Sequence, residues 1–122
     1  MQTIYLENQG NKGFVLHQLP IEAQYAPVYG ITAVDANHDG RQDLLLCGNN
    51  AWTRIKYGRY EANHGVLLLG DGKNNFTYVP QFKSGLNIKG DVRSLIKVAG
   101  SNKKEQIIAG INNAAAVSLM VK

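Results

Sequence analysis

One stretch of the chain, residues 35–43, carries residue types and a spacing that suit a hard metal ion. Oxygen-bearing side chains fall at alternate positions, and Gly40 permits a sharp turn between them. Calcium takes about six to eight oxygen ligands, and a loop that wraps an ion turns alternate side chains inward. A main-chain carbonyl serves at the inward position where no acid stands. The predicted calcium ligands are Asp35, Asn37, Asp39, the carbonyl of Arg41, and Asp43.

The surroundings of this stretch separate it from an EF-hand. The calcium loop of an EF-hand needs a bidentate Glu at its twelfth position, and here that position is Leu46. Apolar runs typical of strands flank the loop on both sides, so a helix-loop-helix is excluded. His38 lies between two ligand positions and is predicted to point into solvent. The alternative to a metal site is a plain hairpin turn rich in Asp, Asn and Gly.

Other chemistry finds little support in the sequence. Cys47 is the single cysteine and ends the apolar run Leu44–Cys47, which predicts a buried thiol and not an activated nucleophile. A lone cysteine also excludes an internal disulfide. The carboxylates of residues 35–43 are better used as ligands, and no phosphate-binding loop is present. We therefore expect a protein that is not an enzyme.

The elements that position the loop repeat along the chain. Residues 5–16 align with residues 67–78 at a shift of 62, and each segment combines two strand-like runs with a Gly/Asn turn. That combination is a hairpin pattern. Residues 28–50 align in the same way with residues 92–113. The shift there is 64 before the turn and 62 after it, which predicts a second turn that is two residues shorter.

The second copy of the loop has a different charge. Lys103 and Lys104 occupy its turn, where the first copy has acids. A divalent cation would be repelled there, so this turn is predicted to hold no metal. The turns at residues 8–13 and 70–75 lack paired acids and are predicted to be ordinary hairpin turns.

Four antiparallel strands per roughly 60 residues is the size of one β-propeller blade. Thirteen glycines and short continuous apolar runs agree with many short, buried strands. We therefore predict an all-β fold of antiparallel, four-stranded blades, in an incomplete propeller of about two to two and a half blades. The predicted parts are a half blade at 1–19, a full blade with the calcium loop at 21–80, and a degenerate blade at 86–122.

The loop DANHDGRQD, the strand DLLLCGN and the later stretch GRYEANHGVLLLGDGKNNF resemble the FG-GAP/VCBS repeat of integrin-α-like β-propellers. The likeness is greatest to the C-terminal part of large bacterial VCBS-repeat proteins. It implies the same five calcium ligands, with Asn37 where many repeats have Asp. It also implies an exported or cell-surface binding scaffold. Family propellers close with about seven blades, so fewer than three blades and no export signal suggest a fragment or a self-associating protein.

The net charge and the hydropathy of the chain limit the classes of partner that we expect it to bind. The net charge is +4, and no basic run exceeds two residues, so a nucleic-acid partner is not expected. No apolar stretch reaches the roughly 20 residues of a membrane span, and no signal-peptide pattern opens the chain. The expected partners are other propeller blades or further copies of this chain, because the outer blades present strand edges.

The long loop at residues 49–64 offers a second function, which is binding of a protein or carbohydrate ligand. Aromatic rings there stack on a sugar or a partner side chain, or they pack against a neighbouring blade. The candidate residues are Trp52, Tyr57, Arg59 and Tyr60.

Overall fold

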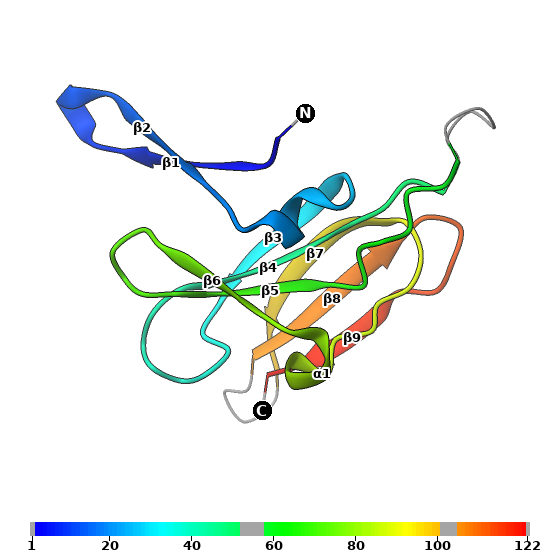
Figure 1. The fold of residues 1–122 in the computed structure, drawn as a ribbon. Coiled ribbons are helices and arrows are strands. Elements are labelled where there is room, and N and C mark those ends of the chain that lie inside the picture. Colours follow the sequence, from blue (N-terminus) through cyan, green and yellow to red (C-terminus); the bar gives the residue numbers. More distant parts are fainter. Residues whose placement is uncertain (1, 52–57, 101–104, 122) are drawn as a thin grey trace.

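A computed structural model describes residues 2–51, 58–100 and 105–121. These residues form three antiparallel sheets of two, four and three strands, with one short α-helix, α1 (Gln81–Ser84) (Figure 1). The first two sheets contain β1 (Ile4–Asn8), β2 (Phe14–Gln18), β3 (Val28–Val34), β4 (Asp43–Gly48), β5 (Val66–Gly70) and β6 (Phe76–Val79). The third contains β7 (Val92–Ala99), β8 (Glu105–Ile111) and β9 (Val117–Met120).

Strands that are neighbours in the sequence are neighbours in each sheet, in the orders β1-β2, β3-β4-β5-β6 and β7-β8-β9. The predicted β class with antiparallel strands is therefore confirmed. Within the described ranges the sheets close neither into a barrel nor into a complete propeller. No helix of these ranges is long and apolar enough to cross a membrane.

The two apolar runs of the sequence form the central strands. β4 and β5 lie in the middle of the four-stranded sheet, and Leu46 and Leu68 have no exposed surface. Their runs are apolar at consecutive positions because both faces of this sheet are covered, so side chains pointing either way are buried. Outer strands such as β1 instead alternate between exposed and half-buried side chains.

The first predicted repeat is present in the structure. In the β1–β2 hairpin Asn8 pairs with Phe14, and in the β5–β6 hairpin Gly70 pairs with Phe76. Both pairs are related by the shift of 62 residues that the sequence predicts. The hairpin β1–β2 is thus the structural equivalent of the third and fourth strands of the next sheet.

The second repeat is present with one correction. β3–β4 and β7–β8 carry a bulge at equivalent places, after Val28 and after Val92. Leu46 pairs with Ile31. Leu95, which is the equivalent of Ile31 at the shift of 64, pairs with Ala109, so Ala109 is the equivalent of Leu46. The shift after the turn is therefore 63 and not 62, and the second turn is one residue shorter, not two. The sequence alignment slipped because both runs are apolar at consecutive positions, which leaves the register weakly marked.

Two apolar cores lie between the three sheets, and equivalent faces of the second and third sheets contribute to them. One face of the four-stranded sheet packs against the β1–β2 hairpin, and we call this the front face of that sheet. It contributes Val28, Leu44, Leu46, Val66 and Leu68 to the first core. The equivalent residues of the third sheet lie in the second core, and they are Val92, Ile107, Ala109, Val117 and Leu119.

The opposite face of the four-stranded sheet, its back face, supplies the other half of the second core. Val34, Leu45 and Cys47 pack there against the front face of β7–β9. Each sheet therefore lays its front face on the back face of the sheet before it. The three sheets are therefore stacked in the same orientation, and we call this arrangement the stack in one sense.

Candidate functional site

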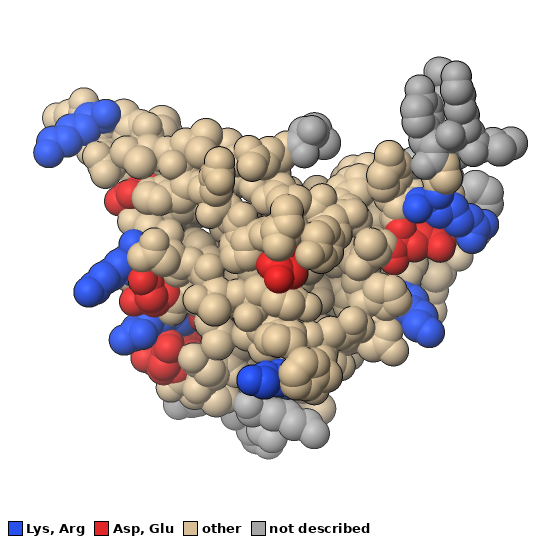
Figure 2. All heavy atoms as spheres, in the orientation of Figure 1, with Lys and Arg blue, Asp and Glu red and all other residues tan. Residues whose placement is uncertain are grey.

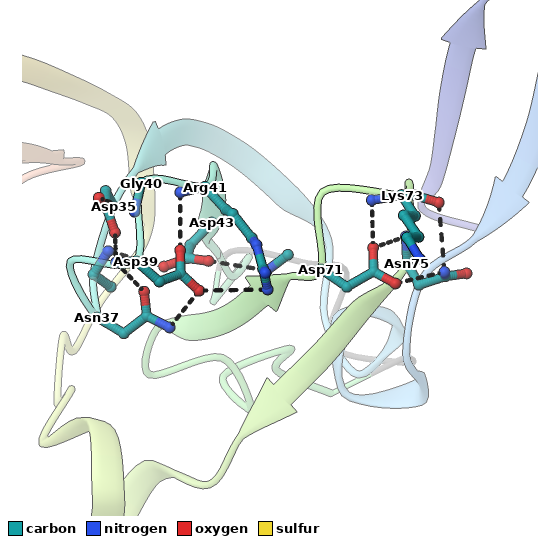
Figure 3. Close-up of polar contacts among 11 residues, drawn as sticks. Asp35, Asn37, Asp39, Gly40, Arg41, Asp43, Asp71, Lys73 and Asn75 are labelled. Carbon is teal, nitrogen blue, oxygen red and sulfur yellow. Dashed lines mark hydrogen bonds and ion pairs between the residues drawn. The ribbon is translucent and has the colours of Figure 1, made fainter.

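The predicted calcium loop joins β3 to β4, and hydrogen bonds from its own side chains to its backbone fix its conformation (Figure 3). The carboxylate of Asp35 accepts hydrogen bonds from the main-chain N–H of Asp39 at 3.0 Å and of Gly40 at 2.9 Å. The N–H of Asp39 also donates to Oδ1 of Asn37 at 3.2 Å. Gly40 has a φ of +79°, a left-handed conformation that glycine adopts without strain.

Asp39 lies at the exposed side of the same loop. Its Oδ1 accepts a hydrogen bond from the N–H of Arg41 at 2.8 Å, and its Oδ2 accepts one from Nδ2 of Asn37 at 3.0 Å. The Arg41 guanidinium is 3.9 Å from the same Oδ2. These contacts favour the charged form. The N–H of Arg41, then the amide of Asn37, and last the Arg41 charge hold the pKa of Asp39 below its ordinary value.

Asp43 has a different environment. Its side chain is fully buried, and its Oδ2 accepts a hydrogen bond from the N–H of Ala36 at 2.9 Å. Its Oδ1 accepts one from the N–H of Gly70 at 2.9 Å. The carboxylate therefore ties the start of the loop to the end of β5. Gly70 is required at this contact, because a Cβ there would lie 2.3 Å from the Gln42 carbonyl oxygen.

The structure thus brings four of the five predicted ligand positions, Asp35, Asn37, Asp39 and Arg41, onto one short loop. It gives the fifth, Asp43, two main-chain partners inside the sheet. Among the described residues no group of three or more His, Cys, Asp or Glu side chains is arranged to hold a metal ion. The carboxylate oxygens of Asp35 and Asp39 accept hydrogen bonds from backbone N–H groups. A calcium ion at this loop would therefore bind oxygens that already accept these hydrogen bonds. His38 is exposed, as the alternation predicts.

The turn between β5 and β6 shows the same chemistry on a smaller scale. The Asp71 carboxylate accepts hydrogen bonds from the N–H groups of Lys73 and Asn75, at 2.6 Å and 3.1 Å, and from the Asn75 amide at 2.7 Å (Figure 3). The Asn75 amide is the largest cause of its lowered pKa, followed by the N–H of Lys73. A single carboxylate stands in this turn, which suits a hairpin turn and not an ion. The turn of the second copy, with Lys103 and Lys104, falls outside the described residues.

The aromatic loop is described in part. Trp52 and Tyr57 lie outside the described residues. Tyr60 is 44% exposed, and its main chain pairs with Asn50 in an isolated antiparallel bridge. The exposed guanidinium of Arg59 is 3.5 Å from Glu61. One antiparallel bridge therefore joins the two described arms of the loop, and the Tyr60 ring beside it is exposed to solvent.

A polar network that sequence reasoning missed fixes the base of this loop. Buried Asn49 donates from Nδ2 to the carbonyl oxygens of Asn63 and Gly90, at 2.6 Å and 3.1 Å. Buried Asp91 accepts a hydrogen bond from the N–H of Ala51 at 2.9 Å and lies 3.4 Å from the guanidinium of Arg93. An Asp directly before a predicted strand and an Arg at the second position of that strand, as in Asp91-Val92-Arg93, are the sequence signal that could have revealed it.

Arg93 completes this network at the surface. Its guanidinium lies 4.3 Å from the ring centroid of Tyr29, a cation–π distance. Cys47 lies deeper, and burial raises the pKa of its thiol to about 12. The thiol is therefore neutral at physiological pH, which agrees with the expectation that it is no nucleophile.

Comparison of the chain with models of protein families, with curated proteins and with solved structures finds no match.

Proposed function

We propose that this chain is a non-enzymatic, calcium-binding segment of β-propeller type that acts as a structural or interaction scaffold. The observation that carries this proposal is the stack in one sense, front face on back face, of three antiparallel sheets of two, four and three strands. Radial repetition of such sheets is the construction principle of propellers. The likeness to FG-GAP/VCBS repeats in the loop and strands is consistent with it, as is an exported or cell-surface location.

Calcium is the cofactor that the donor set suits best. The two carboxylates of Asp35 and Asp39, the amide oxygen of Asn37 and the carbonyl of Arg41 are hard oxygen donors on one exposed loop. Asp43, the predicted fifth ligand, is fully buried and anchors this loop to β5 through the N–H groups of Ala36 and Gly70. A site with few carboxylates typically binds calcium weakly, with a Kd in the range of about 10⁻⁴ to 10⁻³ M that extracellular modules show.

The test is thermal unfolding with calcium and with chelator, for two matched variants. Asp39→Ala and Asp71→Ala each remove an exposed carboxylate that caps main-chain N–H groups in a hairpin turn. Calcium is expected to raise the Tm of the unmodified protein and of Asp71→Ala, because a ligand of the folded state stabilises it by mass action. Asp39→Ala is expected to lose that rise. A Tm that is indifferent to calcium in all three proteins contradicts the calcium site.

A second candidate function is binding of a protein or carbohydrate ligand at the loop of residues 49–64. The exposed Tyr60 ring and the Arg93–Tyr29 pair at the loop base favour it, because exposed aromatics with a nearby guanidinium serve as binding anchors. Tyr60→Ala should then abolish retention on a glycan or protein array without lowering the Tm. Equal retention of the two proteins would remove this candidate.

A further inference from the structure

The stack in one sense leaves one sheet face exposed at each of its two ends. The β1–β2 hairpin turns its back face, which carries Tyr5, toward the first core, so its front face is exposed. The third sheet turns its front face toward the second core, so its back face is exposed. The molecule therefore presents one front face and one back face, which are the two kinds of face that pack together inside it.

The front face of the hairpin is apolar. The register pairs Leu6 with Leu16 and Asn8 with Phe14, and residues that lie directly opposite each other in a sheet share a face. The large apolar side chains of this face are all exposed, and they belong to Ile4, Leu6, Phe14 and Leu16. At the shift of 62 residues their equivalents all pack in the first core, and these are Val66, Leu68, Phe76 and Tyr78. The hairpin thus exposes the positions that the next sheet buries.

The back face of the third sheet is the matching surface. Ile108 pairs with Ile96 on one side and with Ser118 on the other, so these residues share this face with Met120. The side chains of Ile96, Ile108 and Met120 are all exposed. Ile108 is the equivalent of Leu45 at the shift of 63 residues, and Leu45 is buried against the third sheet. This face also exposes a position that is buried inside the stack.

Neither face carries a charged side chain. On the hairpin, Glu7 and His17 lie 2.9 Å apart on the back face, and Lys12 lies in the turn. On the third sheet, Lys97 and Glu105 lie 2.9 Å apart on the front face. In the view of Figure 2, charged side chains gather toward the two sides of the molecule, and the hairpin at the upper left carries a blue side chain at its tip. Exposed apolar faces without charge typically mark interaction sites.

We propose that the front face of the β1–β2 hairpin in one copy of this chain packs on the back face of the third sheet in a second copy. This contact repeats between chains the front-on-back contact that joins the sheets within one chain. It joins faces and not strand edges, so the pairing of β1 with β2 stays intact. Stacked sheets pack about 10 Å apart through their side chains.

The width of the two sheets sets the position of the hairpin. Strict equivalence with the first core would place β1 over β9 and leave β2 beyond the edge of the described sheet. A displacement by one strand, about 4.8 Å, places β1 over β8 and β2 over β9 instead. In that position the four apolar side chains of the hairpin cover Ile108 and Met120, so more apolar surface is removed from water.

The contact is heterologous, because one chain gives the hairpin and the other gives the third sheet. Each chain gives once and accepts once, so copies of the chain form a closed ring or an open filament. The inference rests on the proposed scaffold role, for which it names the partner. It does not use the predicted calcium loop, because no residue from 35 to 42 belongs to a strand of either face.

Sedimentation of two complementary variants and of their mixture, in the presence of chelator, tests the proposal. Phe14→Asp places a charge on the hairpin face, where Phe14 is 67% exposed, and leaves the third sheet intact. Met120→Asp places a charge on the back face of the third sheet, where Met120 is 63% exposed, and leaves the hairpin intact. The unmodified protein should associate at micromolar concentration, and each variant should associate at least about tenfold more weakly. An equimolar mixture should recover a 1:1 dimer, since one intact front face meets one intact back face.

Phe82→Asp is the matched control, because Phe82 is 83% exposed on α1 and belongs to neither face. It should associate as the unmodified protein does. Ser118→Lys repeats the experiment if Met120→Asp lowers the Tm, since Ser118 is exposed on the same face.

A clean monomer of 13.4 kDa for the unmodified protein overturns the proposal. Undiminished association of Phe14→Asp, or a mixture without the 1:1 dimer, also overturns it. Because chelator is present, these outcomes are independent of whether calcium raises the Tm.

Discussion

Two aspartates of one loop have opposite environments. Asp39 is exposed and bonds to neighbours within two residues, whereas Asp43 is fully buried and bonds across 27 residues to Gly70. The sequence gives both the same expected role as ligands. Residue type and spacing predict which oxygens lie near a turn. They do not show which carboxylate is buried and accepts hydrogen bonds from the backbone N–H groups of the sheet.

Asp43→Ala should be much more destabilising than Asp39→Ala. Removal of the buried carboxylate leaves the N–H groups of Ala36 and Gly70 without their partner, at a cost of about 2–4 kcal/mol in the free energy of unfolding. Asp39→Ala should cost less than about 1 kcal/mol in the absence of calcium, since water replaces the lost bonds. Urea unfolding in chelator measures both. Equal losses for the two variants would contradict the assigned roles.

Cys47 should be unreactive in the folded protein. Its pKa is raised to about 12 by burial, so the reactive thiolate is scarce at pH 8. A raised pKa stabilises the folded state fully below the unfolded pKa of about 8.5, and that contribution is lost as the pH rises toward 12. A thiol reagent at pH 8 should therefore modify Cys47 only in denaturant. Rapid modification of the native protein would show that β4 opens readily.

At the scale of elements, the hairpins are predicted well and the register of the paired sheets less well. The β1–β2 and β5–β6 hairpins are marked by Gly/Asn turns and a Phe that starts the return strand, so their bounds follow from local signals. The one-residue error in β8 arose in a run where every residue is apolar. Only burial against the neighbouring sheet distinguishes Ala109 from Ile108 there, and sequence alone does not contain it.

Gly70→Ala should disrupt the junction between the predicted calcium loop and β5. The added Cβ would stand 2.3 Å from the Gln42 carbonyl oxygen, which is backbone and cannot rotate away. We expect a loss of at least about 2 kcal/mol in the free energy of unfolding. Gly10→Ala is the comparison, since Gly10 lies in the β1–β2 turn, where an added Cβ meets nothing within 4 Å. Its cost should be limited to the strain of a positive φ, about 1 kcal/mol.

At the scale of the whole molecule, the β1–β2 hairpin is the least anchored unit. A two-stranded sheet is marginally stable by itself, and this one is held by Tyr5 and by a pair of bonds between Thr3 and Gln24, at 2.7 Å and 2.9 Å. The general β class and the order of strands were predictable, because short apolar runs and turns determine them. The orientation in which the sheets stack was not predictable, because it depends on which face of each sheet packs against the next sheet.

Gln24→Ala should therefore loosen the hairpin selectively. Amide hydrogen exchange of β1 and β2 should become at least about tenfold faster, while β4 and β8 should retain their protection. Tyr25→Ala is the control, because Tyr25 is exposed and makes no contact with Thr3 among the bonds of the described residues. Uniform acceleration in all strands would mean that the hairpin and the sheets unfold as one unit.

The stack in one sense also divides the chain between two ends of the molecule. Three of the described turns inside hairpins, at 9–13, 35–42 and 71–75, lie at one end of the strands. The connections between sheets at residues 19–27 and 80–91 lie at the other end, together with the turn at 112–116 (Figure 1). In evolutionary terms the two ends can vary independently, since insertions in a long connection leave strand pairing intact. The end with short turns is therefore expected to conserve its sequence, and the other end to diversify.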